Sequence, residues 1–406
     1  MQTGSQTALD RVITNWTGMN GYEEFVQAAI LARTIDAGDF HRYSRSPDRQ
    51  EHPQGLPAWL QKTEDFLSGE ELSAKRFKPV LKMIRFGLNK PVAYPNKTIL
   101  PSTLFPELAF FRGVPVMFES SSYAAFAHGD EREGASEIAQ ALLFCEKQPY
   151  DIRLLYFVRA AMTKVVISHL MTVIPSLSQV DCEKLTDGVS QLLDSPKKII
   201  EGYEGEHQMT MAGLDDILNL REPLTRSDSE LSKLLRQLSI DDKAVIRDYA
   251  ASIISGQDQS LVDLLARPES EWGVNLVPIS PPDFNLAYPN ASFQARAFAK
   301  LIVPMVSDDP TQDIGTMFAI NRTQIRLMAL HLRIAAFRWE FDRYPETLLE
   351  VVGREASVDP LTGRDFIYRR TSDGYELYSE GFKGKGKIEV STRWKSAFSD
   401  RLEINP

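Results

Sequence analysis

Histidines and nearby carboxylates are the residues of this chain that could carry acid–base chemistry or bind a metal. None of the six histidines forms a His-x-x-x-His or His-Glu-x-x-His pair, the spacings that place two metal ligands on one helix face. His128 stands beside Asp130 in a Gly-Asp turn, and His207 follows Glu206. The catalytic candidates are therefore His128, Asp130 and His207, which the fold would have to bring together from distant helices.

Each histidine also has a structural explanation. The helix dipole favours a histidine at a helix end, which accounts for His128. His169 and His331 lie within apolar helical stretches, where a hydrogen-bonded core histidine is the commoner role. The sequence contains no nucleophile elbow, phosphate-binding loop or dinucleotide fingerprint. We therefore expect no metal and no cofactor, and catalysis has no supporting motif.

The charge balance and the cysteine count exclude several classes of protein. The chain has 46 Lys and Arg against 55 Asp and Glu, a net charge of −9, whereas a nucleic-acid interface needs clustered basic residues. We therefore predict no nucleic-acid partner. Two cysteines, Cys145 and Cys182, are too few for a disulfide framework or a cysteine-rich zinc site. Two buried free thiols are the favoured state, with a single bridge as the alternative.

The most apolar stretch, residues 154–174, contains Arg159, Lys164 and His169. Three ionisable groups within one span would be costly in a bilayer, so we expect a buried core helix and no membrane span. The first residues carry no apolar run typical of a signal peptide. An anchor encoded upstream of Met1 is a separate possibility, which the genomic sequence before Met1 would test.

The segment 321–345 is the element on which the predicted architecture depends. Its apolar residues form two helical stripes, and a helix that is apolar on two sides is usually packed between two layers. The first stripe comprises Ile325, Met328, Leu332, Ala335 and Trp339, and the second comprises Leu330, Ile334, Phe337 and Phe341. We expect one stripe to face the upstream helices and the other to face a small hairpin.

The pattern predicts a mainly α fold. Residues 1–306 form a multi-helix bundle or an irregular array of helical hairpins, because apolar residues recur there at helical spacing. Within this region, the proline-rich stretch 267–290 is expected to be a connector whose apolar residues, Trp272 among them, dock on the surface. Residues 307–406 are expected to form a second unit, the long helix plus a small α+β module.

The spacing of the apolar residues changes after Pro345 from a helical to a strand-like pattern. Two β-prone runs, 366–370 and 375–379, flank the turn sequence Ser-Asp-Gly at 372–374, which predicts an antiparallel hairpin. Trp394 and Phe398 indicate that the last residues also dock on the protein.

Turn residues recur in a fixed order near the end of the chain. They are Asp342-Arg343-Tyr344-Pro345, Asp359-Pro360, Gly363, Asp373-Gly374-Tyr375 and the run from Leu377 to Gly381. Over residues 332–386 this order resembles the globular part of the major pseudopilin of type II secretion systems. The resemblance implies a long helix that ends at the proline and is covered by a small hairpin, since proline disfavours helical geometry in the residue before it.

Two departures from that pattern are informative. Pseudopilins of this type bind calcium with acidic side chains and carbonyls in the loop after the last strand. Here that loop carries Lys383, Lys385 and Lys387, and calcium prefers carboxylate ligands, so we predict no calcium there. Pseudopilins also carry an N-terminal membrane helix with a processed leader. In this chain the equivalent helix follows a long helical region instead.

The upstream region, with Asn20-Gly21-Tyr22 near its start, is similar to planctomycete-like bacterial envelope proteins that join helices to a pseudopilin-like end. That resemblance implies an extracytoplasmic or envelope-associated location. The expected function is a non-enzymatic binding or assembly protein of the cell envelope, with a protein partner. Two alternatives stay open. One is an envelope hydrolase with a site assembled from distant helices, and the other is a cytoplasmic helical scaffold, which applies if Met1 is the native start.

Overall fold

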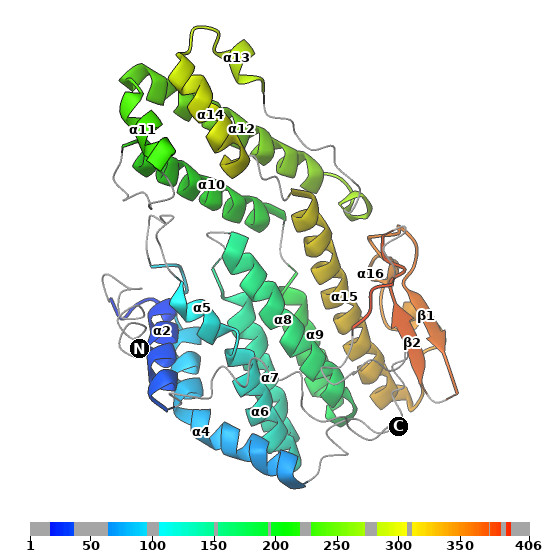
Figure 1. Ribbon diagram of the computed structural model, residues 1–406. Helices are drawn as coiled ribbons and strands as arrows, with labels where there is room; N and C mark the ends of the chain where they lie inside the picture. The colour runs from blue at the N-terminus through cyan, green and yellow to red at the C-terminus, as the bar shows by residue number, and fades with distance from the viewer. Residues whose placement is uncertain are drawn as a thin grey trace.

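A computed structural model describes most of the chain. The described residues are 17–35, 64–95, 105–149, 153–193, 196–219, 229–272, 282–306, 311–372, 374–382 and 387–390. Over these residues the fold is mainly helical, with one small antiparallel sheet of two strands near the C-terminus (Figure 1). The predicted fold class is confirmed.

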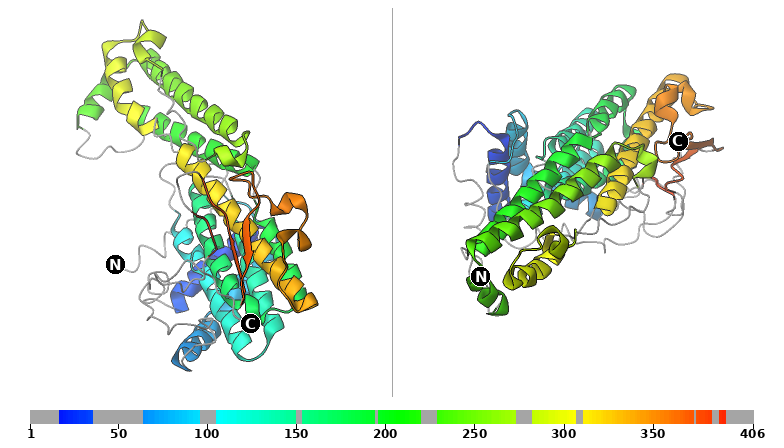
Figure 2. Two further views of the ribbon diagram at one scale, coloured as in Figure 1. Left: turned by 90° about the vertical axis from the view of Figure 1, so that its right-hand side faces the viewer. Right: turned by 90° about the horizontal axis from the view of Figure 1, so that it is seen from above.

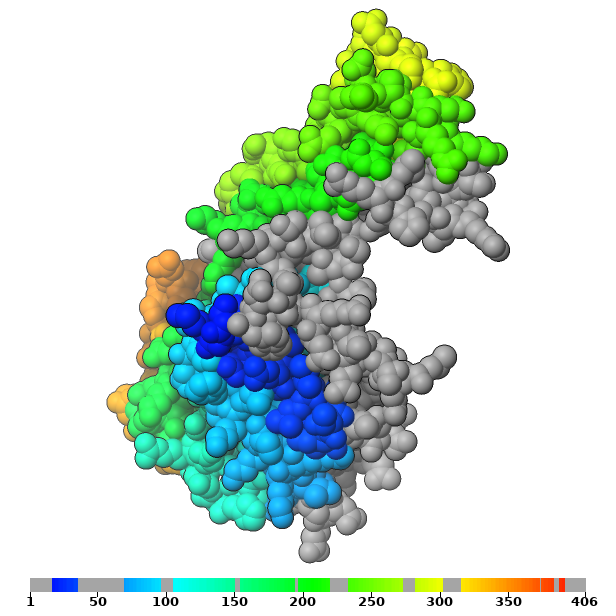
Figure 3. Space-filling view, turned by 90° about the vertical axis from the view of Figure 1, so that its left-hand side faces the viewer, coloured from blue at the N-terminus to red at the C-terminus, as the bar shows by residue number. Residues whose placement is uncertain are grey.

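A bundle of helices forms the lower body of the molecule in Figure 1. Its members are α2 (Gly21–Ile35), α4 (Glu64–Leu88), α5 (Pro106–Phe111), α6 (Val114–Ala127), α7 (Glu131–Glu146), α8 (Arg153–Val173), the short η1 (Ile174–Ser176) and α9 (Gln179–Gln191). Phe25, Phe111 and Phe144 meet edge to face at its centre, with ring centroids 4.9 to 6.1 Å apart. Such contacts add to the burial of three large rings. The outer face formed by α2 and α4 is seen in Figure 3.

A second group of helices forms the upper arm in Figures 1 and 2. It consists of α10 (Pro196–Leu218), α11 (Ser229–Gln237), α12 (Ile240–Leu265), α13 (Phe284–Ala287) and α14 (Phe293–Val306). The arm has its own hydrophobic cluster, which includes Leu214, Ile246 and Phe298. The base of α10 belongs to the main core through Ile199 and Tyr203, so this helix links the two cores.

The long helix α15 (Thr311–Phe341) lies between α9 and the small sheet (Figure 1). Met328 and Leu332 of its first stripe and Ile334 of its second are fully buried. The sheet pairs β1 (Ile367–Arg370) with β2 (Tyr375–Tyr378). With η4 (Leu348–Glu350) and α16 (Arg354–Ser357), the sheet forms a cap on α15. The helix therefore has one face toward the helical body and another toward the cap.

The last turn of α15 departs from the predicted stripes. Trp339 is 60% exposed and Phe341 is 50% exposed, although both continue the apolar pattern. The reason is that the body ends beside them: α8 gives way to η1, and the Trp339 indole donates a hydrogen bond to the Leu177 carbonyl just after that turn. The final turn of α15 extends past the end of the body, so Trp339 and Phe341 are left partly exposed.

The most apolar helix and both cysteines are buried in the core. Among the described helices, the window Leu154–Ser176 is long and apolar enough to cross a bilayer, but 72% of it is buried inside the protein, so it is no clear membrane span. Cys145 and Cys182 are both buried and free, as predicted. Burial raises the pKa of each thiol to about 12, so neither forms a reactive thiolate at neutral pH.

The described start of the proline-rich connector is docked, as predicted. The Trp272 ring stacks on Phe318 of α15, with centroids 5.3 Å apart and planes 9° apart. Directly before Trp272 comes η3 (Glu269–Glu271), where the Glu269 carboxylate accepts hydrogen bonds from Arg322 and Arg326. These two arginines of α15 are therefore paired within the chain.

Neutralising Glu269 should weaken this docking. Burial raises the pKa of Glu269, but the hydrogen bonds and charges of Arg326 and Arg322 outweigh it and hold the pKa below the usual 4.5. A lowered folded-state pKa means that the stabilisation is present above about pH 4.5 and is lost as the pH falls through the folded value. We expect Glu269→Gln to lower the free energy of unfolding by about 1–3 kcal/mol at pH 7, with a smaller difference in acid. Urea denaturation at both pH values measures it. Glu271→Gln, on the exposed side of the same turn, is the matched control and should change little.

Candidate binding site at the seam between body and cap

The catalytic candidates from the sequence occupy separate structural roles. His128 caps the C-terminus of α6, and its Nε2 lies 3.1 Å from a carboxylate oxygen of Glu71. Asp130 caps the N-terminus of α7 by accepting the N–H of Glu133. The His207 Nδ1 lies 2.5 Å from Asp258 Oδ1.

His207 belongs to a different part of the molecule from the other two candidates. It lies on α10, which pairs with α12 in the upper arm, whereas α6 and α7 belong to the lower body (Figures 1 and 2). The turn that holds His128 and Asp130 is thus a capping turn, and His207 joins two helices of the arm. The described residues also contain no group of three or more His, Cys, Asp or Glu side chains placed to hold a metal ion.

Ser122, His169 and Glu119 lie next to one another in the helical body, with the histidine between the serine and the glutamate as in a catalytic triad. Ser122 Oγ lies 3.1 Å from His169 Nε2, and His169 Nδ1 lies 3.9 Å from Glu119 Oε1. However, the Ser122 hydroxyl donates its hydrogen to the carbonyl of Gly134 at 3.0 Å, so the histidine is not placed to remove that proton. All three side chains are nearly fully buried. We assign this cluster to the core, where it joins α6, α7 and α8.

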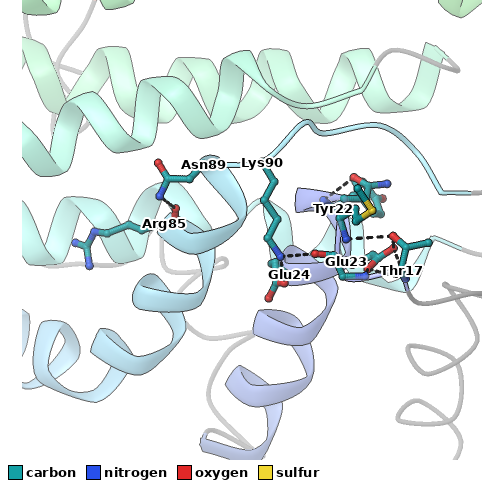
Figure 4. A network of polar contacts seen from close by, with 10 residues as sticks. Thr17, Tyr22, Glu23, Glu24, Arg85, Asn89 and Lys90 are labelled. Carbon is teal, nitrogen blue, oxygen red and sulfur yellow. Dashed lines mark hydrogen bonds and ion pairs between the residues drawn. The ribbon is translucent and has the colours of Figure 1, made fainter.

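The Asn20-Gly21-Tyr22 segment also has a structural role, seen in Figure 4. The Glu23 carboxylate accepts hydrogen bonds from the Thr17 and Gly18 N–H groups and from the Thr17 hydroxyl. Beside it, Lys90, two residues after the end of α4, pairs with Glu24 at 2.5 Å. Asn20 holds the same junction, because its amide donates to the Ala93 carbonyl and its oxygen accepts from Ala93 N–H.

A pocket lies where the helical body, the end of α15 and the cap meet; we call it the seam pocket. Its volume is about 420 Å³, within the usual range for ligand sites. The walls are formed by Ile174, Pro175, Ala335, Arg338, Trp339, Asp342, Tyr344 and Tyr375. The partly exposed Trp339 described above is therefore part of a concave surface.

The polar groups of the seam pocket are held in fixed positions. Arg338 Nη1 donates to the Tyr344 hydroxyl at 2.9 Å, and its guanidinium lies over the Tyr344 ring, 4.9 Å from the centroid. Asp342 is exposed and has a φ of 51°, because the chain turns sharply after the helix. The pocket thus offers guanidinium N–H groups, one carboxylate and three aromatic rings.

The inner wall of the seam pocket depends on a buried hydrogen bond between α15 and β2. His331 Nδ1 lies 2.8 Å from the Tyr375 hydroxyl. Burial lowers the pKa of His331 to about 3 and raises the pKa of Tyr375 well above its ordinary value. Both groups are therefore neutral at physiological pH, and His331 Nε2 has no partner among the described residues. The pair joins the cap to the helix without acting as an acid or base near pH 7.

Acid should destabilise the protein through His331. An unfolded histidine binds a proton below about pH 6.5, whereas the folded pKa is about 3, so stability falls as the pH drops through this window. Because one pKa unit corresponds to about 1.4 kcal/mol, wild type should lose about 2–3 kcal/mol more than His331→Gln between pH 7 and pH 4.5. Urea midpoints at the two pH values measure this difference. His128→Gln, which changes a surface ring, should retain the wild-type pH dependence.

The turn residues of the pseudopilin-like pattern hold the outer part of the cap. The buried Asp359 carboxylate accepts hydrogen bonds from the Ser379 hydroxyl at 2.7 Å and from Leu361 N–H at 3.0 Å. The Tyr368 hydroxyl donates to the Pro345 carbonyl at 2.7 Å. The first two bonds hold the loop after α16 to the residue that follows β2, and the third holds β1 to the segment after α15. The lysines at 383 and 385 lie outside the described residues.

Neither the seam pocket nor its ligand-facing residues were predicted. The only local signal was that Trp339 and Phe341 continue an apolar stripe to the very end of α15, past the point that the body can cover. Comparison with protein-family models, with curated proteins and with solved structures finds no match for the chain.

Proposed function

We propose that this chain is a non-enzymatic binding or assembly protein of the bacterial envelope, whose seam pocket accepts an aromatic side chain of a polypeptide partner. The observation that carries the proposal is the pocket of about 420 Å³ with the 60% exposed Trp339 in its wall. Exposed tryptophan in a concave site is typical of the residues that dominate protein interfaces.

The chemistry of the walls favours a peptide as the ligand. Aromatic faces of Trp339 and Tyr344 suit an apolar or aromatic side chain, and Arg338 and Asp342 offer hydrogen bonds to main-chain carbonyl and N–H groups. A pocket with one positive and one negative group suits the peptide main chain, which is neutral and offers both N–H donors and carbonyl acceptors. An isolated ion would match only one of the two groups. Three further residues of the lining, Ile174, Pro175 and Ala335, are apolar.

The same residues argue against catalysis in the pocket. Proton transfer at neutral pH is most efficient from a group with a pKa near 7. Burial raises the pKa of Tyr344 and of Tyr375, and no histidine of the described part of the chain lines the pocket. A hydrolase built on His128, Asp130 and His207 would need a common site, and these residues have separate partners. The envelope location rests on the sequence resemblances of residues 332–386 and of the Asn20-Gly21-Tyr22 segment.

Peptide selection tests the binding proposal. A random peptide library is selected on the full chain and counter-selected on Ala335→Trp, which fills the pocket. We expect the retained peptides to contain an aromatic residue and to bind at least about tenfold more weakly to Trp339→Ala, since loss of a central anchor typically costs more than 1.4 kcal/mol. Phe293→Ala, which truncates an 80% exposed ring on α14, should bind like wild type.

The variants need a folding check, because a tryptophan at 335 enlarges a half-buried position. Trp339→Ala removes a largely exposed side chain, so its fold should be retained by circular dichroism. Recovery of no peptide after the counter-selection, or retained peptides that bind Trp339→Ala as tightly as wild type, would reject the proposal.

A further inference from the structure

The two charged side chains of the seam pocket differ in their exposure to water. Arg338 is half-buried, whereas Asp342 is exposed where the chain turns after α15. Opposite charges attract more strongly away from bulk water, because the effective dielectric constant falls from about 80 in water to about 20 near a protein surface. A charged ligand group therefore gains most at the guanidinium, while water or a neutral N–H donor is enough for the carboxylate.

Arg338 is held in position to bind an anion. Its Nη1 donates to the Tyr344 hydroxyl at 2.9 Å, and its guanidinium lies over the Tyr344 ring. Burial raises the pKa of Tyr344, so both contacts are with a neutral phenol and neither cancels the positive charge. A guanidinium has five N–H donors in one plane, and two of them can bind a carboxylate through parallel hydrogen bonds.

The aromatic walls of the seam pocket offer ring surface, because their polar atoms are bound within the chain. The Trp339 indole N–H donates to the Leu177 carbonyl at 2.6 Å. The Tyr375 hydroxyl lies 2.8 Å from His331 Nδ1. These two walls are therefore suited to the face or edge of an aromatic ring.

One amino-acid residue can contact all of these groups at once. The Asp342 N–H donates to the Arg338 carbonyl at 2.9 Å, which places the two residues one helical turn, about 5 Å, apart. The last residue of a polypeptide presents a carboxylate, an amide N–H and a side chain from a single Cα. Its carboxylate matches Arg338, its N–H matches Asp342, and an aromatic side chain matches Trp339.

We propose that the seam pocket binds the C-terminal residue of its partner, an aromatic residue whose free carboxylate pairs with Arg338; this inference rests on the proposed function. An aromatic residue within a chain would bring only a neutral carbonyl to the half-buried guanidinium. An N-terminal residue would place its ammonium beside the exposed Asp342, where water screens the attraction and an ion pair contributes little.

Three short synthetic peptides of glycine and serine with one tryptophan test this inference on the full chain. The first ends in tryptophan with a free carboxylate, the second is the same peptide as its C-terminal amide, and the third begins with tryptophan and ends in an amide. Titrations followed by saturation-transfer NMR give the three dissociation constants. We expect the free acid to bind at least tenfold more tightly than either amide, because hydrogen bonds to charged groups contribute more than the about 1.4 kcal/mol that corresponds to a factor of ten.

Two arginine variants locate the source of this preference. Arg338→Gln should weaken binding of the free acid at least tenfold and remove its advantage over the amide. Glutamine can still donate to the Tyr344 hydroxyl, so the circular dichroism spectrum should be unchanged. Arg343→Gln is the matched control, because Arg343 pairs with Glu350 at 2.8 Å and is not among the lining residues of the pocket. It should keep the wild-type preference.

The outcomes separate this inference from the proposed function. Equal binding of the free acid and the amide, tighter binding of the peptide that begins with tryptophan, or a preference that persists in Arg338→Gln would each overturn recognition of the chain end. The proposed function would stand in these cases if the bound peptides still require Trp339. If none of the three peptides binds but the library yields peptides that depend on Trp339, only the inference is rejected. If the library selection also fails, the proposed function is rejected with it.

Discussion

Phe318→Ala should lower the free energy of unfolding by about 3–5 kcal/mol, the usual cost of removing a fully buried aromatic ring. Phe318 is completely buried, and its ring stacks on Trp272 of the connector. It also meets Tyr156 of α8 edge to face at 5.8 Å. The substitution would leave a cavity where the connector, α8 and α15 meet, and the three elements cannot all close around it.

Urea denaturation followed by circular dichroism at the helix band measures this loss. Phe293→Ala removes the same ring from an 80% exposed position on α14 and should change the stability by less than about 0.5 kcal/mol. Equal effects of the two substitutions would show that α15 is not packed against α8 as described.

Gly21→Ala should cost about 3 kcal/mol, at the upper end of the range for overpacking, because α2 and α4 touch main chain to main chain at this point. A Cβ at Gly21 would lie 2.2 Å from the Gly87 carbonyl oxygen and 2.8 Å from Val92 Cγ2. The Gly21 N–H also donates to the Pro91 carbonyl at 2.8 Å, so the helix start cannot shift without losing that bond.

The matched control for Gly21→Ala is Gly69→Ala, which should change the stability in the opposite direction. Gly69 lies within α4 with no atom within 4 Å of its added Cβ. Alanine there should stabilise the protein by about 0.5–1 kcal/mol, because it removes the entropic cost of glycine in a helix. Thermal melting of both variants gives the two shifts, and a Gly21→Ala protein as stable as wild type would contradict the close helix contact.

Much of the architecture could be predicted from the sequence because it follows from local patterns. The 3.6-residue spacing of Ile325, Met328 and Leu332 indicated a helix, and the β-prone runs around Ser372 indicated the hairpin; both were confirmed. The docking of Trp272 was also predicted, since an apolar ring within a polar, proline-rich stretch has a strong tendency to be buried.

The candidate site could not be predicted because it has no local pattern. Its walls come from η1, from the end of α15 with the segment that follows it, and from β2, three stretches that are far apart in the sequence. The partners of the polar side chains are equally distant in the sequence: Ser122 and His169 are 47 residues apart, and Glu269 and Arg326 are 57 residues apart. Sequence reasoning named His128 and His207 because of their neighbours, and tertiary contacts gave both residues other partners.

The seam pocket is the centre of this account, and the fluorine resonance of Trp339 tests it most directly. The full-length protein, labelled with 5-fluorotryptophan and with the Trp339 resonance assigned by Trp339→Phe, is titrated with a library-selected aromatic peptide. We expect the Trp339 resonance to shift and saturate while that of the buried Trp272 stays in place. A peptide that binds without moving the Trp339 resonance would contradict the account.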